Sequence, residues 1–215
     1  MKGDIIIVEP HHRRAADQIA TRLIEAIRSH GTRYTITVAG ESGSGKSETA
    51  QAIADALETQ GFRSAILQQD DYFVHPPRTN DRTRRANICW VGPTEVRLDL
   101  LDEHLSAAVA GAPSIIKPLV IYDEDRLVDE ELDLDGIDVV IAEGTYTTLL
   151  ETVDTRVFIA RNRLETMEHR MKRGREDFDP FIERVLEIEH EIISQHRARA
   201  DVIITRGYDV EFSRG

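Results

Sequence analysis

Apolar residues recur along the chain in two patterns that alternate with each other. In the first they are spaced four residues apart, as Ile19, Leu23 and Ile27 are, and this spacing predicts a helix that ends at Gly31. In the second they form short β-branched runs, which predict strands. The predicted helices are residues 12–30, 46–60, 94–110, 162–173 and 179–198, and the predicted strands are residues 34–39, 63–68, 137–142, 156–160 and 201–205.

Several of these strands are continuously apolar, as residues 139–142 are, and do not alternate between apolar and polar positions. Such strands are typical of a parallel sheet that helices cover on both faces. We therefore expect a three-layer α/β fold with a mainly parallel, five-stranded sheet, and a single domain over residues 1–215. Residues 72–93 show no clear period and read as a long ordered loop.

Composition narrows the class of protein. The 215 residues carry 27 Lys and Arg against 39 Asp and Glu, a formal charge of −12, which disfavours a nucleic acid as partner. The apolar runs at residues 5–8 and 139–142 are far shorter than the ~20 residues of a membrane-spanning helix, so we expect no membrane association. The single cysteine, Cys89, fits a reducing compartment, and we expect a cytoplasmic protein.

The strongest motif follows the first predicted strand and opens the next helix. It reads Gly40-Glu41-Ser42-Gly43-Ser44-Gly45-Lys46-Ser47 and matches the G-x-x-x-x-G-K-S phosphate-binding loop. Its glycines let backbone N–H groups point at phosphate oxygens, and the helix N-terminus favours the same anion. Lys46 can reach the β- and γ-phosphates, and the Ser47 hydroxyl can bind Mg²⁺. We expect ATP to bind at residues 40–47 and at Glu48, the next residue.

Acidic residues end two further strands. Asp70 and Asp71 follow the second strand, and Glu143 ends the third. Ligands of parallel sheets bind beyond the carboxyl ends of the strands, so these acids are expected beside the γ-phosphate. One aspartate can orient an attacking hydroxyl or take its proton, and Glu143 can bind Mg²⁺. A turn-forming Asp pair and a plain strand-end acid are the structural alternatives.

Four arginines, Arg163, Arg170, Arg173 and Arg175, surround the predicted helix at residues 162–173 and its exit. They can close over a triphosphate as a lid at about residues 162–177 and neutralise the charge of the transferring phosphoryl group. The alternative is a solvated helix face on which they pair with neighbouring glutamates. A GTPase is excluded, because Asp133-Leu134-Asp135-Gly136 precedes its strand and no guanine-reading motif is present.

Together these motifs resemble the uridine kinase and phosphoribulokinase-like branch of the P-loop kinases. The resemblance continues in chain order through Gln69-Asp70-Asp71-Tyr72-Phe73, Leu98-Asp99-Leu100-Leu101, Glu143-Gly144, Arg163-Leu164, Lys172-Arg173-Gly174-Arg175 and Ala200-Asp201-Val202-Ile203-Ile204. It implies a P-loop NTPase fold and transfer of a phosphoryl group from ATP, with Mg²⁺, to a hydroxyl of a small molecule. By the same similarity, Asp70 is the catalytic base and a metal-site residue, Lys46 and Arg173 assist transfer, and Arg170, Arg173 and Arg175 contact the nucleotide.

The departures from this family concern the acceptor. Uridine kinases carry Asp-His-Pro where this chain has Val91-Gly92-Pro93, and the histidine expected after Tyr122-Asp123 is replaced around Asp125-Arg126. We therefore expect an acceptor other than uridine. The candidate substrate residues are Asp71, Tyr72, Arg82, Tyr122 and Arg126.

Five arginines near the acceptor side, Arg78, Arg82, Arg84, Arg85 and Arg126, suggest an anionic or sugar-phosphate substrate, although they can equally be surface charges. Two other functions stay open: a nucleotide-binding switch without phosphotransfer, and an ATPase that acts on a macromolecule. The sequence also leaves open whether the chain forms a homo-oligomer.

Overall fold

The computed structural model describes residues 6–161 and 179–213, and within them a six-stranded sheet forms the centre of the molecule. The strand order is β2-β5-β1-β6-β7-β8, and every neighbouring pair is parallel except β7 and β8. The strands are β1 (Tyr34–Gly40), β2 (Ser64–Gln68), β5 (Val139–Glu143), β6 (Thr155–Ile159), β7 (Val202–Ile204) and β8 (Val210–Phe212). The α/β fold with a mainly parallel sheet is therefore confirmed.

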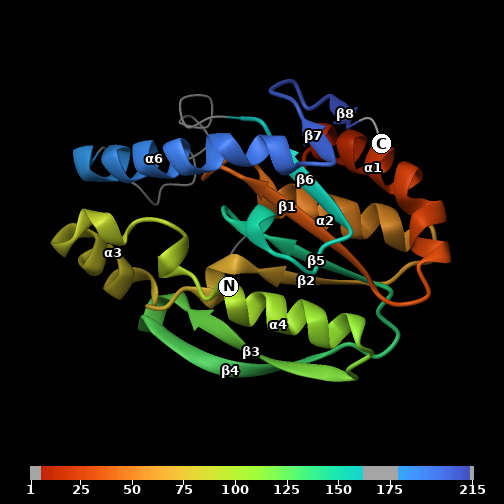
Figure 1. Ribbon diagram of the computed structural model, residues 1–215, viewed down its shortest axis with the longest axis horizontal. Helices are drawn as coiled ribbons and strands as arrows, with labels where there is room; N and C mark the ends of the chain where they lie inside the picture. The colour runs from red at the N-terminus through yellow and green to blue at the C-terminus, as the bar shows by residue number, and fades with distance from the viewer. Residues whose placement is uncertain (1–5, 162–178, 214–215) are drawn as a thin grey trace.

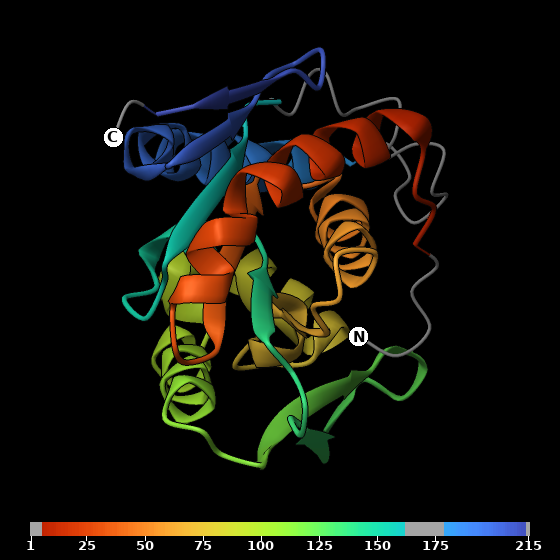
Figure 2. The same cartoon turned by 90° about the vertical axis from the view of Figure 1, so that its right-hand side faces the viewer.

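Helices cover both faces of the sheet (Figures 1 and 2). One buried cluster joins the strands to α1 (Pro10–Ser29) and α2 (Lys46–Glu58), and a second joins their other face to α4 (Leu98–Val109) and α6 (Pro180–Ile193). β1 and β5 are buried along their whole length, and this burial on both faces explains the continuous apolar run of residues 139–142 in β5.

The parallel register brings the ends of three strands to one edge. Val38 of β1 and Gln68 of β2 both lie opposite Glu143 of β5. The phosphate-binding loop follows β1, and the 3-10 helix η1 (Gln69–Tyr72) follows β2. The loop, Glu143 and Asp70 therefore emerge side by side, as expected for a binding site at the carboxyl ends of parallel strands.

Three features differ from the prediction. The sheet has six strands and not five, because β8 adds an antiparallel edge. A separate antiparallel hairpin, β3 (Ser114–Ile121) and β4 (Arg126–Asp133), lies beside α4 (Figure 1). Residues 72–93, predicted as a loop, contain α3 (Pro77–Ala86), of which only Asn80 is buried. Without an apolar stripe, α3 gives no helical period.

Two short 3-10 helices, η2 (Ile88–Trp90) and η3 (Pro93–Glu95), follow α3 along the chain. A third, η4 (Tyr122–Glu124), connects β3 to β4. Two more, η5 (Thr147–Leu149) and η6 (Ser194–Arg199), follow β5 and α6. The predicted helix at residues 162–173 lies outside the described residues.

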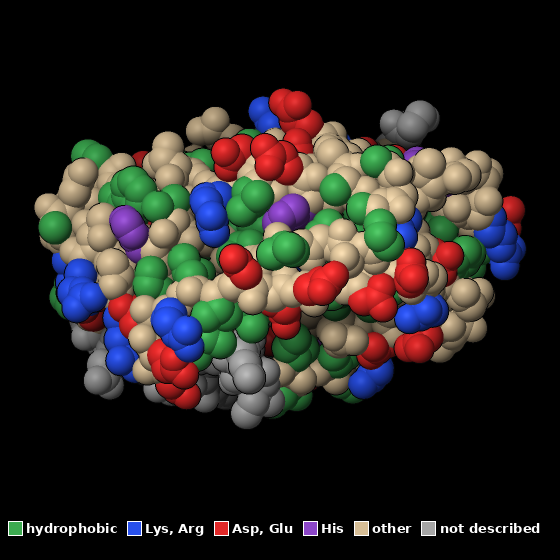
Figure 3. All heavy atoms as spheres, turned by 90° about the horizontal axis from the view of Figure 1, so that it is seen from below, with side chains coloured by type: hydrophobic (Ala, Val, Ile, Leu, Met, Phe, Trp, Pro, Cys, Tyr) green, Lys and Arg blue, Asp and Glu red, His purple; other side chains and the backbone are tan. Residues whose placement is uncertain are grey.

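The hairpin side of the molecule is acidic in character. Asp129, Glu131 and Asp133 of β4 are exposed, and Figure 3 shows acidic side chains recurring along this face. Among the described helices, none combines the length and the apolar character that crossing a membrane requires.

Candidate functional site

The phosphate-binding loop connects β1 to α2. The residues around its last glycine, Gly45, leave no room for a side chain. Gly45 has φ +94°, and a Cβ there would lie 2.5 Å from the Tyr208 hydroxyl and 2.9 Å from Nε2 of His12. Gly45 is also the N-cap of α2 and has no side chain that could cap the helix. The first-turn amides of α2 therefore face the loop, where an anion can bind them.

A buried chain of hydrogen bonds supports this loop from behind. The backbone N–H of Glu9 donates to Nδ1 of His12 (3.1 Å), so the proton of the neutral ring lies on Nε2, which contacts the Tyr208 hydroxyl at 3.1 Å. Tyr208 in turn donates to the carbonyl of Ser44 (3.0 Å) and accepts from Arg161 (3.2 Å). The start of α1 and the β7–β8 turn thus hold the backbone of the phosphate-binding loop.

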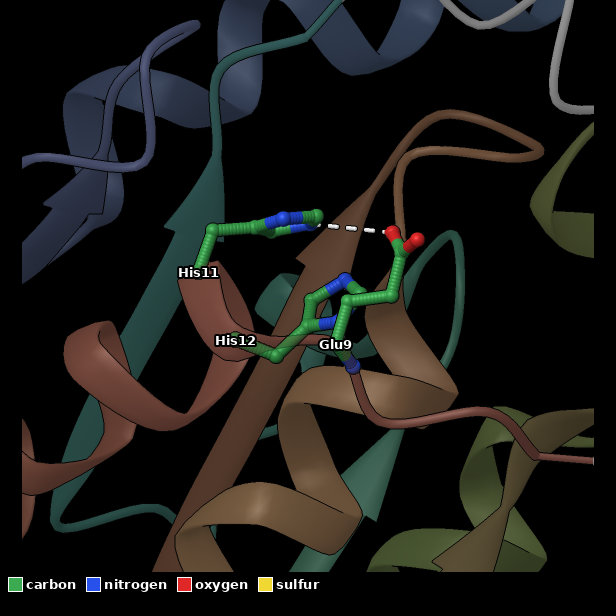
Figure 4. A group of neighbouring side chains, drawn as sticks. All are labelled: Glu9, His11 and His12. Atoms are coloured by element: carbon green, nitrogen blue, oxygen red, sulfur yellow. Dashed lines mark hydrogen bonds and ion pairs between the residues drawn. The ribbon is translucent and has the colours of Figure 1, made fainter.

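His12 belongs to a group whose residue types could suggest a metal site. Ligand atoms of Glu9, His11 and His12 lie within 4.8 Å of one another, and Figure 4 shows His11 pointing toward the carboxylate of Glu9. Both ring nitrogens of His12 already have hydrogen-bond partners, however. The group is better explained as support for the loop, in agreement with the expectation that this segment begins a helix.

Lys46 and Ser47 each form a hydrogen bond to another residue of the site. The Lys46 ammonium group donates to the carbonyl of Glu41 (3.0 Å), and the Ser47 hydroxyl donates to Oε1 of Glu143 (2.9 Å). Burial, together with the charge of Asp70, raises the pKa of Glu143 to about 7, although Lys46 and Ser47 oppose the shift. A hydroxyl and a carboxylate at this distance form an oxygen donor set of the kind that Mg²⁺ prefers.

Asp70 is held by a close contact between the ends of β2 and β5. The Gln69 side chain packs against Gly144, where any Cβ would collide with it, and its Oε1 accepts the N–H of Tyr146 (2.7 Å). The buried Gln69 fixes η1, whose next residue, Asp70, is exposed. Asp70 and Ser42 of the phosphate-binding loop line the same cavity.

Two acidic residues of the predicted nucleotide site are buried. Oε1 of Glu41 lies 2.6 Å from Nδ1 of His190, which joins the phosphate-binding loop to α6. Glu48 lies in the first turn of α2, and its charge adds to the effects that raise the pKa of Glu143.

The cavity has a volume of about 650 Å³ and extends from Ser42 and Asp70 to the region between α3 and α6. Figure 1 shows α3 and the first part of α6 at the same end of the molecule. Of the predicted substrate residues, Arg82 and Tyr122 belong to the lining. The others in that set, Asp71, Tyr72 and Arg126, do not.

Asp71 and Tyr72 instead hold neighbouring elements together. The Asp71 carboxylate, 2% exposed, accepts from Nζ of Lys117 (3.0 Å) and the N–H of Val120 (2.9 Å), and so fixes β3 to the end of β2. The buried Tyr72 hydroxyl contacts Nδ1 of His104 in α4 (2.8 Å), and burial raises its pKa. Arg126 is exposed and pairs with Glu124 (2.7 Å). The structure therefore does not bring these three side chains to the acceptor.

An ion network at the cavity was not expected from the sequence. Arg84 donates from Nε and Nη2 to the two carboxylate oxygens of Glu95 (2.7 and 2.6 Å) and from Nη2 to Glu189 of α6 (3.3 Å). Asn80 donates to the same Glu95 (3.0 Å). Burial raises the pKa of Glu189, and Arg84 opposes that effect. Spacing offers no signal for this network, because its members come from three separate elements.

Arg163, Arg170, Arg173 and Arg175 lie outside the described residues, as does the rest of the predicted lid. Their roles therefore stay predictions.

The comparisons with known proteins agree with the geometry of the loop. The chain matches the Phosphoribulokinase / Uridine kinase family over residues 35–212. It is 31% identical over 186 residues to the bifunctional alpha-galactosidase/sucrose kinase AgaSK of Mediterraneibacter gnavus, in a match that covers 80% of this chain and 20% of that protein. It is 30% identical over 142 residues to the uridine kinase of Ureaplasma urealyticum, which covers 64% of this chain and 67% of that one.

The fold also recurs in a solved structure. The D-glycerate 3-kinase from Cryptococcus neoformans superposes with a TM-score of 0.64 and 16% identity, covering 92% of this chain and 99% of that chain. The family match includes the phosphate-binding loop, Asp70 and Glu143 and most of the chain. This chain therefore belongs to the phosphoribulokinase/uridine kinase family of small-molecule kinases.

Proposed function

We propose that this protein transfers the γ-phosphoryl group of MgATP to a hydroxyl group of a small molecule other than uridine. The observation that carries the proposal is the position of Asp70. Its exposed carboxylate lines a cavity that begins at Ser42 of the phosphate-binding loop and continues between α3 and α6. A nucleotide phosphate bound at the loop and an acceptor in the cavity would both lie beside this acid.

The nucleotide is held by the phosphate-binding loop. The amides of residues 40–47 and the α2 N-terminus bind the β- and γ-phosphates, and Lys46 exchanges the Glu41 carbonyl for phosphate oxygens. Ser47 and Glu143 would hold Mg²⁺, with Asp70 nearby as a second acid. The ion, when bound, neutralises charge on the β- and γ-phosphates.

In the transfer step, Asp70 orients the acceptor hydroxyl and takes its proton. The acceptor oxygen forms a bond to the γ-phosphorus, the bond from that phosphorus to the β–γ bridging oxygen breaks, and ADP leaves. A carboxylate within hydrogen-bond reach of the acceptor hydroxyl can take its proton as a general base. Arg170, Arg173 and Arg175 are proposed, from the family resemblance, to contact the nucleotide and close the site, and residues 1–215 to act as one kinase domain.

The test is coupled ADP release, screened over nucleosides, sugars, sugar acids and vitamins. The relatives named above suggest where to begin, since their names give uridine, sucrose and D-glycerate as acceptors of those proteins. We expect ADP release that depends on one acceptor and on Mg²⁺, and that Lys46→Ala abolishes. ATP binding without ADP release for any acceptor would favour a nucleotide-binding switch and contradict the proposal.

A further inference from the structure

Whether the cavity can bind a negatively charged acceptor depends on the arginines that surround it. A phosphate or carboxylate on the acceptor needs guanidinium groups whose N–H donors are available to it. Four arginines line the cavity: Arg78, Arg82, Arg84 and Arg85. Their partners among the described residues show whether that positive charge is available.

The most buried of the four pairs with two acids. The side chain of Arg84 is 18% exposed and contacts Glu95, whose side chain is 0% exposed, and Glu189, which is 10% exposed. Its Nε and Nη2 groups point to these carboxylates. Two carboxylates face this one guanidinium, so the part of the cavity beside Arg84 has no net positive charge.

The next two arginines are paired as well. Arg85 contacts Asp81 (2.8 Å) and Asp179 (2.6 Å), and its guanidinium lies over the ring of Phe181, 4.5 Å from the centroid. Arg82 lies 3.6 Å from Asp125. Three of the four lining arginines thus face five carboxylates, and Asp70 adds a further negative charge at the phosphate end.

We propose that the acceptor is an uncharged, polyhydroxylated molecule and not a phosphorylated or carboxylated one. This inference rests on the proposed kinase function and replaces the anionic substrate that the arginines suggest in the sequence. Three acids line the cavity, and three more lie behind the lining, where they pair with its arginines: Asp70, Asp81 and Glu189 in the first set, Glu95, Asp125 and Asp179 in the second. These six acids outnumber the four lining arginines, so like charges beside the triphosphate oppose the binding of a second anion.

The lining suits hydroxyl groups and the C–H faces of a sugar ring. The carboxylates of Asp70 and Glu189 can accept hydrogen bonds from hydroxyl groups. Where a carboxylate pairs with an arginine, its acceptor oxygens lie beside N–H donors. Tyr122, which is 39% exposed, and Phe181 supply aromatic surface in the same cavity. The volume of about 650 Å³ lies within the range of small-molecule sites.

The experiment compares matched acceptors that differ in one anionic group: fructose with fructose 6-phosphate, uridine with uridine 5′-monophosphate, and glycerol with glycerate. Coupled ADP release is measured at pH 8 with the wild-type protein. We expect a neutral member to be phosphorylated with a kcat/KM on the order of 100-fold above that of its anionic partner, because like-charge contacts oppose the latter. An anionic member used as well as or better than its neutral partner would overturn the inference while leaving the kinase function intact.

A variant tests the cause. Glu189→Gln keeps an oxygen for Arg84 but removes one negative charge from the cavity, and we expect the anionic-to-neutral ratio of kcat/KM to rise about tenfold. Glu187→Gln makes the same charge change two residues away, where Glu187 pairs with Arg184 outside the lining, and should leave the ratio unchanged. An unchanged ratio in Glu189→Gln, or an equal rise in both variants, would contradict the inference. ADP release for no acceptor in the wider screen contradicts the proposed function, and the inference then fails with it.

Discussion

The two adjacent aspartates that follow β2 should differ in how much they stabilise the fold. Asp71→Asn should lower the free energy of unfolding, whereas Asp70→Asn should leave it nearly unchanged. Asp71 is 2% exposed and accepts hydrogen bonds from Lys117 and from the backbone of Val120. Asp70, its neighbour, is exposed. Replacing each with asparagine removes one charge and changes the shape very little, so each variant is the control for the other.

The size of the stability loss follows from the contacts of Lys117. Breaking a buried ion pair by removing one partner costs ~3–5 kcal/mol, because the other charge is left buried. In Asp71→Asn, Lys117 keeps a second partner, Glu130 at 3.0 Å, and the new amide side chain keeps an oxygen for the Val120 N–H, so the cost should be nearer ~2–3 kcal/mol. For a chain of this size that loss lowers Tm by roughly 4–12 °C.

Urea unfolding followed by circular dichroism, with a thermal melt, measures this difference. We expect Asp71→Asn to lower the unfolding midpoint at an unchanged m value, and Asp70→Asn to stay within about 0.5 kcal/mol of the wild type. Hydrogen exchange in the folded protein should be faster across β3 and β4 in Asp71→Asn. Equal stability of Asp71→Asn and the wild type would refute the assignment of Asp71 as the residue that fixes the hairpin.

Two further predictions concern the phosphate end of the site. Tyr208→Phe removes the donor to the Ser44 carbonyl, so the ATP Kd should rise about fivefold, as expected for a hydrogen bond worth ~1 kcal/mol. Tyr34→Phe, which loses a buried hydrogen bond to Thr155 at the other end of β1, should leave the Kd unchanged, and a similar rise in both variants would mean that the loop support is not specific. The buried Glu143, with its pKa raised to about 7, binds a proton more tightly in the folded than in the unfolded state, so without Mg²⁺ the free energy of unfolding should fall as pH rises from about 4.5 to about 7. Glu143→Gln should flatten this part of the stability curve measured by urea titration at several pH values, and an unchanged slope would show that Glu143 does not cause it.

The parts of the fold that apolar periodicity describes could be predicted from the sequence. β1, β5 and α1 differ from their predicted bounds by one or two residues, because both strands are buried at every position and the buried residues of α1 recur with the helical period. The β3–β4 hairpin could not be predicted in this way. Its buried positions combine Ile115 and Val120 with the charged Lys117, and β4 is mostly charged, so the apolar pattern is interrupted and an ion pair joins the apolar contacts that fix the hairpin.

The residues of the site also fall into two groups: those whose geometry follows from the local sequence and those whose roles depend on contacts between distant segments. The phosphate-binding loop is contiguous in sequence, and its residue types nearly determine its geometry. The substrate residues depend on contacts between distant segments: Asp71 faces Lys117, and Arg84 faces Glu95 and Glu189. Charge alone suggests that the five arginines bind an anion, whereas four of them pair with carboxylates of the described residues: Arg82, Arg84, Arg85 and Arg126.

The proposed mechanism requires that Asp70 accept the proton of the attacking hydroxyl. Single-turnover transfer from labelled ATP to the identified acceptor, measured in Asp70→Asn beside ATP binding in the same preparation, isolates this step. We expect an unchanged ATP Kd and a transfer rate lower by about 10²–10⁴-fold, the usual contribution of a general base. Transfer at the wild-type rate by folded Asp70→Asn would contradict it.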